Sequence, residues 1–253
     1  MDVAILTVGD EILAGDTTNT NASWLAEEIS GRGSRVRRIL TVPDDRALIA
    51  TYVADWRSAF DAVLVTGGLG DTPDDVTMEA VADAVGREMV VYGNERERLV
   101  EQARRFREAN PEMTEEYDLD LDVDAAASLP VDARPLSTDV GWAPGCVVEN
   151  VYVFPGFPDE MQAMFGLVAE EFVGDAVSEV VWTPTPEGAL GDVIDGIDER
   201  FDVAVGSYPD KGETPGRLKV SGTDPEEVDD AVAWIRDNLD VVDDPDTVPN
   251  GGE

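Results

Sequence analysis

Four acidic residues beside glycine-containing loops are the side chains of this sequence best suited to do chemistry. Asp10 and Glu11 follow one apolar run, and Asp74 and Asp75 follow a glycine-rich stretch at residues 66–70 (T-G-G-L-G). Glycine lets backbone N–H groups approach an anion because it has no Cβ. Carboxylates repel a bare phosphate, so these residues make chemical sense as a phosphate site when a divalent cation bridges the two.

The residues that follow the glycines can also be explained as a helix start that has no role in binding or catalysis. Thr72 is a good helix N-cap, Pro73 suits the first helical position, and Asp75 lies three residues after the cap, as in a capping box. Acidic residues in a first helical turn, where we expect Asp74 and Asp75, are stabilised by the helix dipole alone. Capping explains the three glycines less well, and both interpretations stay open.

Apolar runs predict the elements that position these loops. Residues 62–65 (A-V-L-V) and 3–9 are typical of buried parallel strands, and residues 76–85 have helical spacing. In an open parallel sheet, ligands bind at the carboxyl edge of the strands. We therefore expect the two acidic loops to meet across a crevice.

A third loop is expected at the same edge. The run 146–154 reads as a strand with a hairpin-like bend at Asn150, and it ends in Pro155 and Gly156 before a helix predicted to extend to about Phe172. A binding role and plain turn chemistry are both open for this loop.

The remaining pattern predicts an α/β fold with two domains. A further strand (35–42), a helix to about residue 58, a short strand (88–92) and a charged helix (94–108) belong to the first. After a boundary near residue 174, the order β-α-β-β-α indicates a small α+β unit. We expect domains at 1–174 and 175–242, followed by a frayed tail at 243–253.

Composition excludes several classes of function. The 253 residues contain no histidine and one cysteine, Cys146, so histidine-dependent catalysis, an intrachain disulfide and thiolate metal clusters are excluded. The net charge of −37 indicates adaptation to a high-salt cytoplasm, as in halophiles, and disfavours nucleic acid as a partner. No signal peptide or membrane span is evident, so a soluble cytoplasmic protein without membrane partners is expected.

Several short motifs occur together and in order. They are 8–13 (V-G-D-E-I-L), 18–21 (T-N-T-N), 66–70 with 74–77 (D-D-V-T), 141–145 (G-W-A-P-G), 155–161 (P-G-F-P-D-E-M) and 206–209 (G-S-Y-P). Together they resemble the MoaB/Mog-type molybdopterin-binding domain, above all the version in the CinA (competence- and damage-inducible protein A) family. The resemblance covers essentially the whole chain.

The resemblance implies a three-layer α/β/α domain with a mostly parallel sheet, assembled as a homo-oligomer (dimer or trimer). It also implies metal-dependent pyrophosphatase activity on ADP-ribose-like dinucleotides, whereas relatives outside the CinA branch bind or adenylylate molybdopterin. The carboxy-terminal deamidase domain of CinA proteins is expected to be missing. Where many relatives read G-P-T-H-D-D, this chain has Asp71 for the proline and Pro73 for the histidine, which puts activity or metal preference in question.

Two functions follow as hypotheses. In the first, the protein hydrolyses a nucleoside diphosphate-linked compound: Asp10, Glu11, Asp74 and Asp75 hold magnesium, manganese or cobalt, with potassium as a further cation, and Asp74 and Asp75 are catalytic. In the second, the same pocket binds molybdopterin or a nucleotide without chemistry. The substrate-binding residues are expected to be Gly9, Thr18, Asn19, Asn21, Thr66, Gly67, Gly68, Leu69, Gly70, Pro155 and Gly156.

Overall fold

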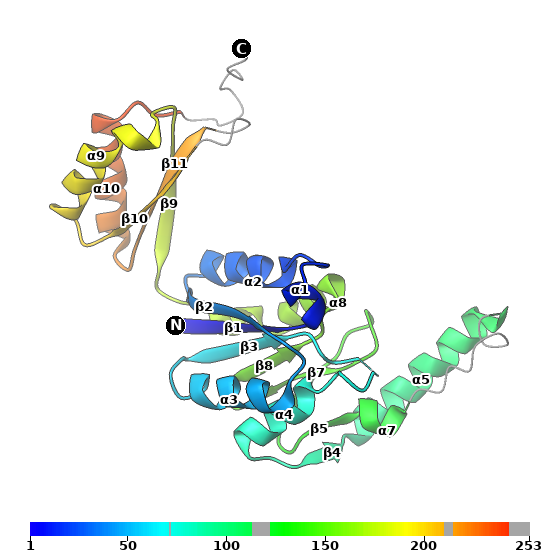
Figure 1. Ribbon diagram of the computed structural model, residues 1–253. Coiled ribbons are helices and arrows are strands. Elements are labelled where there is room, and N and C mark those ends of the chain that lie inside the picture. Colours follow the sequence, from blue (N-terminus) through cyan, green and yellow to red (C-terminus); the bar gives the residue numbers. More distant parts are fainter. Residues whose placement is uncertain (71, 113–121, 210–214, 243–253) are drawn as a thin grey trace. The chain divides into compact units, whose positions relative to one another are not determined.

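The structure is a computed structural model that describes residues 1–70, 72–112, 122–209 and 215–242. The chain divides into two compact units, Met1–Gly174 and Asp175–Glu253 (Figure 1). No helix among the described residues is both long enough and apolar enough to cross a bilayer.

The first unit alternates strands and helices. Its strands are β1 Asp2–Val8, β2 Arg35–Val42, β3 Ala62–Thr66, β4 Met89–Val91, β5 Ser128–Pro130, β6 Arg134–Leu136, β7 Gly145–Val148 and β8 Val151–Phe154. Its helices are α1 Asp10–Leu13, α2 Thr20–Gly31, α3 Arg46–Trp56, α4 Thr77–Val85, α5 Gly93–Ala109, α7 Val123–Ala126, α8 Pro158–Gly166 and the 3-10 helix η1 Ala169–Phe172.

Six of these strands form one sheet in the order β2-β1-β3-β8-β7-β6. Strands β2, β1, β3 and β8 are mutually parallel, and β7 and β6 are antiparallel to their neighbours. Strands β4 and β5 pair separately. The mostly parallel α/β architecture predicted from the sequence is confirmed.

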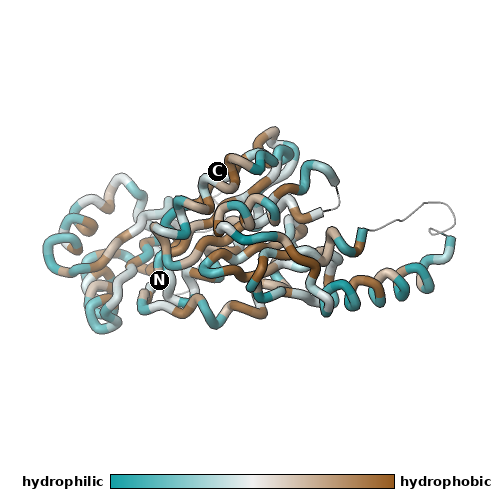
Figure 2. The backbone as a smooth tube through the Cα atoms, turned by 90° about the horizontal axis from the view of Figure 1, so that it is seen from below, coloured by the Kyte–Doolittle hydropathy of each residue, from teal (hydrophilic) through white to brown (hydrophobic). Residues whose placement is uncertain are grey.

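Helices cover both faces of this sheet, which gives three layers (Figure 1). Along β1, Val3 and Ile5 pack with α2 and α8 on one face, whereas Ala4 and Leu6 join the cluster with α3 and α4 on the other. A strand buried on both faces needs apolar residues at every position, which explains the uninterrupted apolar run. In Figure 2, brown stretches run through the interior, and the coiled segments at the outside alternate between teal and brown.

Several sequence predictions need correction. Helix α4 begins at Thr77 with Val76 as its cap residue, so Thr72 is not the N-cap, and Asp74 and Asp75 lie in the turn before the helix. The helix predicted from Pro158 to Phe172 is interrupted: α8 ends at Gly166, and η1 follows. The bend near Asn150 is a hairpin between β7 and β8, as predicted.

The second unit is a three-stranded antiparallel sheet with two helices. Its elements are β9 Val177–Thr183, the 3-10 helix η2 Glu187–Ala189, α9 Gly191–Asp198, β10 Ala204–Tyr208, β11 Gly216–Gly222 and α10 Pro225–Asn238. The strand order is β10-β11-β9. Val181, Leu218, Ile197 and Ile235 form the centre of its core, which lies between the sheet and the helices. The predicted β-α-β-β-α order is confirmed.

Candidate functional site

The four parallel strands end at one edge of the large sheet. Strand β1 lies between β2 and β3, so the connection after β1 leads to one side of it and the connection after β2 leads back to the other side. This arrangement is the topological switch point at which open α/β sheets bind ligands. The loops after β1, β2, β3 and β8 therefore share one rim.

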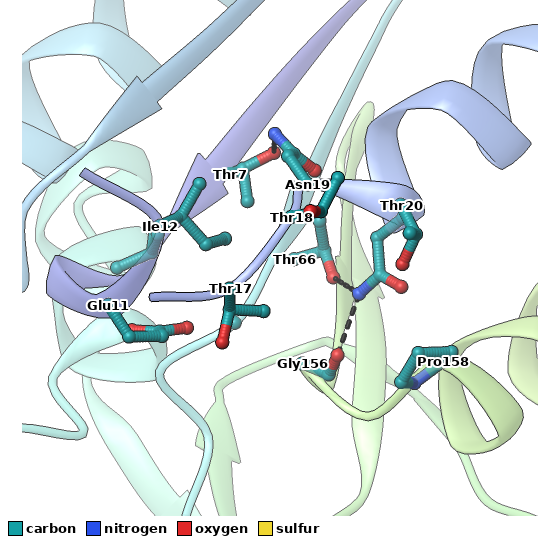
Figure 3. Close-up of a pocket in the computed structure, with 13 residues that line it drawn as sticks. Thr7, Glu11, Ile12, Thr17, Thr18, Asn19, Thr20, Thr66, Gly156 and Pro158 are labelled. Carbon is teal, nitrogen blue, oxygen red and sulfur yellow. Dashed lines mark hydrogen bonds between the residues drawn. The ribbon is translucent and has the colours of Figure 1, made fainter. Parts of the chain in front are cut away.

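A pocket of about 380 Å³, counting the part that opens to solvent, lies at this rim (Figure 3). Its lining is mainly neutral and polar. The hydroxyl and amide side chains that line it are Thr7, Thr17, Thr18, Thr20, Thr66, Asn19 and Asn21. Glu11 is the single charged side chain among the described lining residues, and Gly67, Gly156 and Pro158 contribute from the other loops.

Asn21 ties three loops together at the base of the pocket. Its Nδ2 donates to Thr66 Oγ1 at 3.2 Å and to the Gly156 carbonyl oxygen at 2.7 Å, and Thr66 Oγ1 donates to the Pro155 carbonyl oxygen at 2.8 Å. In Figure 3 the two dashed lines that mark the Asn21 Nδ2 bonds end on the labelled Thr66 and Gly156. Its Oδ1 is buried, and no donor from the described residues reaches it. A buried acceptor without a partner is costly, so this oxygen is suited to a ligand donor.

Asn19 lines the same pocket, but its amide is fully engaged inside the protein. Its oxygen accepts from the backbone N–H of Ala22 as the N-cap of α2, and its nitrogen donates to Thr7 Oγ1 at 3.0 Å and Thr41 Oγ1 at 3.3 Å. These contacts fix the start of α2 against β1 and β2. Thr18 is exposed and lines the pocket two residues before the start of α2.

Gly67 and Gly68, which follow β3, must be glycines because neighbouring atoms leave no room for a Cβ. Gly67 has φ +104°, and a Cβ there would lie 2.1 Å from the carbonyl oxygen of Val8. Gly68 has φ +65°, and a Cβ there would lie 2.4 Å from Thr77 Oγ1. Leu69 is half-buried and packs against the core, so its contribution is structural.

Three of the four predicted acidic residues, Asp10, Glu11 and Asp74, lie near enough to raise the pKa of Asp44, a residue that the sequence analysis did not select. Asp44 follows β2, and its Oδ2 accepts the backbone N–H of Asp10 at 3.0 Å. Burial raises the pKa of Asp44, and the negative charges of Asp10, Glu11 and Asp74 raise it further against the lowering effect of that hydrogen bond. In the sequence, the feature that could have identified Asp44 as a site residue is its position shortly after the strand predicted at residues 35–42.

Asp75 is used locally. Its Oδ2 accepts from the backbone N–H of Thr72 at 2.9 Å and from the Thr72 hydroxyl, and it lies against Gly70. Asp74 is exposed. Neither residue lines the pocket.

The arrangement does not fit a ready metal centre. In the ranges that the structure describes, no group of three or more Asp, Glu, His or Cys side chains is placed to hold a metal ion. Asp71 lies outside those ranges. The carboxylates thus create a negative field at the rim, and no catalytic step through a metal follows from their geometry.

Phe157 is a second residue that the sequence analysis did not select. It lies between two pocket residues, Gly156 and Pro158, as the cap residue of α8, and its side chain is 73% exposed. An exposed aromatic ring beside a polar pocket can cover a planar ligand. In the sequence, Phe157 could have been identified because a large aromatic residue stands inside a turn made of Pro and Gly (155–158).

Comparison with known proteins assigns one family model to each of the two units. A family model described as "Probable molybdopterin binding domain" matches residues 4–175, and one described as "FAD synthase, middle domain" matches residues 175–244. The two matches meet where the two compact units divide.

Individual relatives extend the comparison. A protein of Archaeoglobus fulgidus is 37% identical over 241 residues, which cover 94% of this chain and 98% of that protein. A CinA-like protein of Citrifermentans bemidjiense is 39% identical over 169 residues, 65% of this chain and 38% of its own length. The crystal structure of a CinA protein of unknown function from Thermoplasma acidophilum matches with a TM-score of 0.56 and 30% identity, covering 68% of this chain and 99% of that one.

The fold, the pocket at its switch point and these matches lead to one assignment: the chain belongs to the MoaB/Mog-type molybdopterin-binding domain family and is similar to CinA-like proteins.

Proposed function

We propose that the first unit binds a phosphorylated heterocycle, a pterin of the molybdopterin class or a nucleotide, in the pocket at the switch point. The observation that carries this proposal is the buried, unpartnered Oδ1 of Asn21. It accepts hydrogen bonds only, and an ionised phosphate has no proton to donate. A ring N–H, an exocyclic amine or a sugar hydroxyl of the ligand supplies the missing donor.

The remaining lining suits the other parts of such a ligand. Helix α2 begins at the pocket with Thr20, and its dipole attracts a phosphate, while the N–H groups of Thr20 and Ala22 already donate to Thr18 and Asn19. Thr17 and Thr18 add hydroxyl donors at the mouth. Phe157 covers the ring of the ligand. The description of the matched family, which names molybdopterin, supports the same ligand class.

Hydrolysis of a nucleoside diphosphate-linked compound is the second candidate. The observation in its favour is the gathering of Asp10, Glu11 and Asp74 around Asp44 at the same rim. Against it, the described carboxylates form no metal centre, and Asp74 and Asp75 lie outside the pocket lining. Binding without chemistry is therefore the better-supported function.

Calorimetry with ADP-ribose, ADP and a 6-substituted pterin phosphate, in molar KCl, tests the binding proposal. We expect saturable binding of at least one of them by the intact chain and loss of that binding in Asn21→Leu. Equal binding by the intact chain and Asn21→Leu would overturn the assignment of the pocket.

The same samples, supplied with magnesium, manganese or cobalt, test the second candidate. Release of AMP from ADP-ribose would make hydrolysis, and not binding alone, the better-supported function. Turnover that is unchanged in an Asp74→Asn, Asp75→Asn double variant would refute the catalytic roles of those two carboxylates.

A further inference from the structure

One face of the small sheet is left uncovered by α9 and α10. Along β11 the side chains alternate: Leu218 and Val220 are buried in the core of this unit, whereas Arg217 and Lys219 lie on the opposite face. We call that opposite face of β10, β11 and β9 the open face. In the described part of the second unit, its large exposed hydrophobic side chains are Val180 and Tyr208, and both belong to the open face.

The strand register places two aromatic rings and an arginine in one row. Tyr208 pairs with Arg217, and Arg217 pairs with Trp182 on the other side. The Arg217 guanidinium lies over both rings, 4.9 Å from the centroid of Tyr208 and 5.4 Å from that of Trp182. Gly206 makes room for this arrangement, because a Cβ there would lie 3.1 Å from the Tyr208 ring.

The next row supplies a second cation. Lys219 pairs with Gly206 and with Val180, two residues along each strand from the aromatic row. Among the ion pairs between described residues, none includes Arg217 or Lys219. The two cations therefore face outward without a carboxylate partner in the described ranges.

The charge of the open face is unusual for this chain. More than a fifth of all residues are Asp or Glu, yet the three rows of the face contain neither. The third row consists of Ala204, Ser221 and Ser178. An acid-free face with two cations and two rings is complementary to a planar anion.

We propose that the open face binds a single nucleotide. The base stacks on the outer face of the planar Arg217 guanidinium, which lies over both rings, and the phosphate is bound by Lys219. Two cations suit one nucleotide rather than a longer strand, because the net charge of −37 repels a polyanion. This site is built from residues of the second unit alone and uses the G-S-Y-P motif at residues 206–209.

Indole N–H signals of the intact, 15N-labelled chain report on this site directly. The Trp182 signal is assigned by its loss in Trp182→Phe, and the chain is then titrated with AMP. We expect a saturable shift of that signal, about tenfold weaker binding in Arg217→Ala, and no measurable shift when Lys219→Ala is added. Arg200→Ala is the matched control, because it removes a similar contact, over Trp234 at 5.3 Å, in the same unit.

Four outcomes would overturn the proposal. The first is an unmoved Trp182 signal, and the second is equal affinity in Arg217→Ala and Arg200→Ala. The third is an oligonucleotide of ten deoxyadenosines that binds much more tightly than AMP, which would indicate a strand site. The fourth is a change of molecular mass in sedimentation caused by Arg217→Ala, which would make the face an interface between copies. Persistence of the shift in Asn21→Leu shows that it is independent of the pocket in the first unit.

Discussion

The side-chain amide of Asn21 donates a 2.7 Å hydrogen bond to the carbonyl oxygen of Gly156, 135 residues further along the chain. This bond joins the start of α2 to the loop after β8, and the same nitrogen also donates to Thr66 at the end of β3. One amide thereby fixes three walls of the pocket and leaves its own oxygen for a ligand.

Replacing Asn21 by leucine removes both roles. We expect the free energy of unfolding to fall by about 1–3 kcal/mol, because the Gly156 and Thr66 acceptors lose their donor, and we expect ligand binding to be lost. Urea denaturation and calorimetry measure the two effects. Asn238→Ala removes an amide on α10 that donates to Trp234, and it should leave binding unchanged.

Replacing Asp44 by asparagine should stabilise the folded protein at neutral pH in dilute buffer. The pKa of Asp44 is raised, so the folded state disfavours its charged form, and this cost is present above the raised pKa. The cost disappears as the pH falls through that pKa toward the ordinary value of 3.8. Asparagine keeps an oxygen that accepts from the Asp10 N–H.

Urea midpoints of the two proteins between pH 3 and pH 8 check the Asp44 prediction. The advantage of Asp44→Asn should shrink at low pH and also in molar KCl, which screens the surrounding carboxylates. A variant that is less stable at pH 7, or a difference that is independent of pH, would contradict the electrostatic explanation.

Replacing Phe157 by alanine should weaken ligand binding without unfolding the protein. Its ring is 73% exposed, so the free energy of unfolding should change by less than about 0.5 kcal/mol. Loss of a ring that covers the ligand should cost about 0.5–1.5 kcal/mol of binding free energy. Leu167→Ala, at the far end of α8 with 53% exposure, is the control; equal effects of the two variants on affinity would argue against a role for Phe157.

Replacing Gly67 by alanine should be severe. Its added Cβ would meet the Val8 carbonyl oxygen at 2.1 Å, and φ is +104°, so β1 and the glycine loop cannot keep their spacing. Gly86→Ala separates the steric clash from the backbone strain, because Gly86 has φ +66° but no atom within 4 Å of a new Cβ. We expect about 1–2 kcal/mol of destabilisation from backbone strain for Gly86→Ala and more for Gly67→Ala, as measured by thermal and urea unfolding.

Salt should stabilise this chain. Its net charge of −37 produces self-repulsion that ions screen, so the thermal midpoint should rise steadily from 0.1 M to 2 M KCl. Comparing KCl with uncharged sucrose distinguishes screening from general exclusion of solute. A midpoint that is insensitive to KCl would refute the interpretation as a halophilic protein.

Much of the fold was determined by local sequence. The unbroken apolar runs of β1 and β3 are those of strands buried on both faces, and they predicted a parallel sheet before any contact was known. The order β-α-β-β-α in the remainder of the chain likewise predicted a small α+β unit. These patterns are local because each residue's burial follows the period of its own element.

The site was decided by the tertiary structure. Sequence suggested that Asp10 and Asp74 share a rim, but only the placement of β2 beside β1 brought Asp44 into hydrogen-bond contact with Asp10. The start of α4 at Thr77 placed Asp74 and Asp75 in a preceding turn, away from the pocket lining. The partner of Asn21 lies 135 residues away, and the Tyr208, Arg217 and Trp182 row exists only through strand register. Contacts between distant segments depend on how whole elements pack, and no local period encodes that packing.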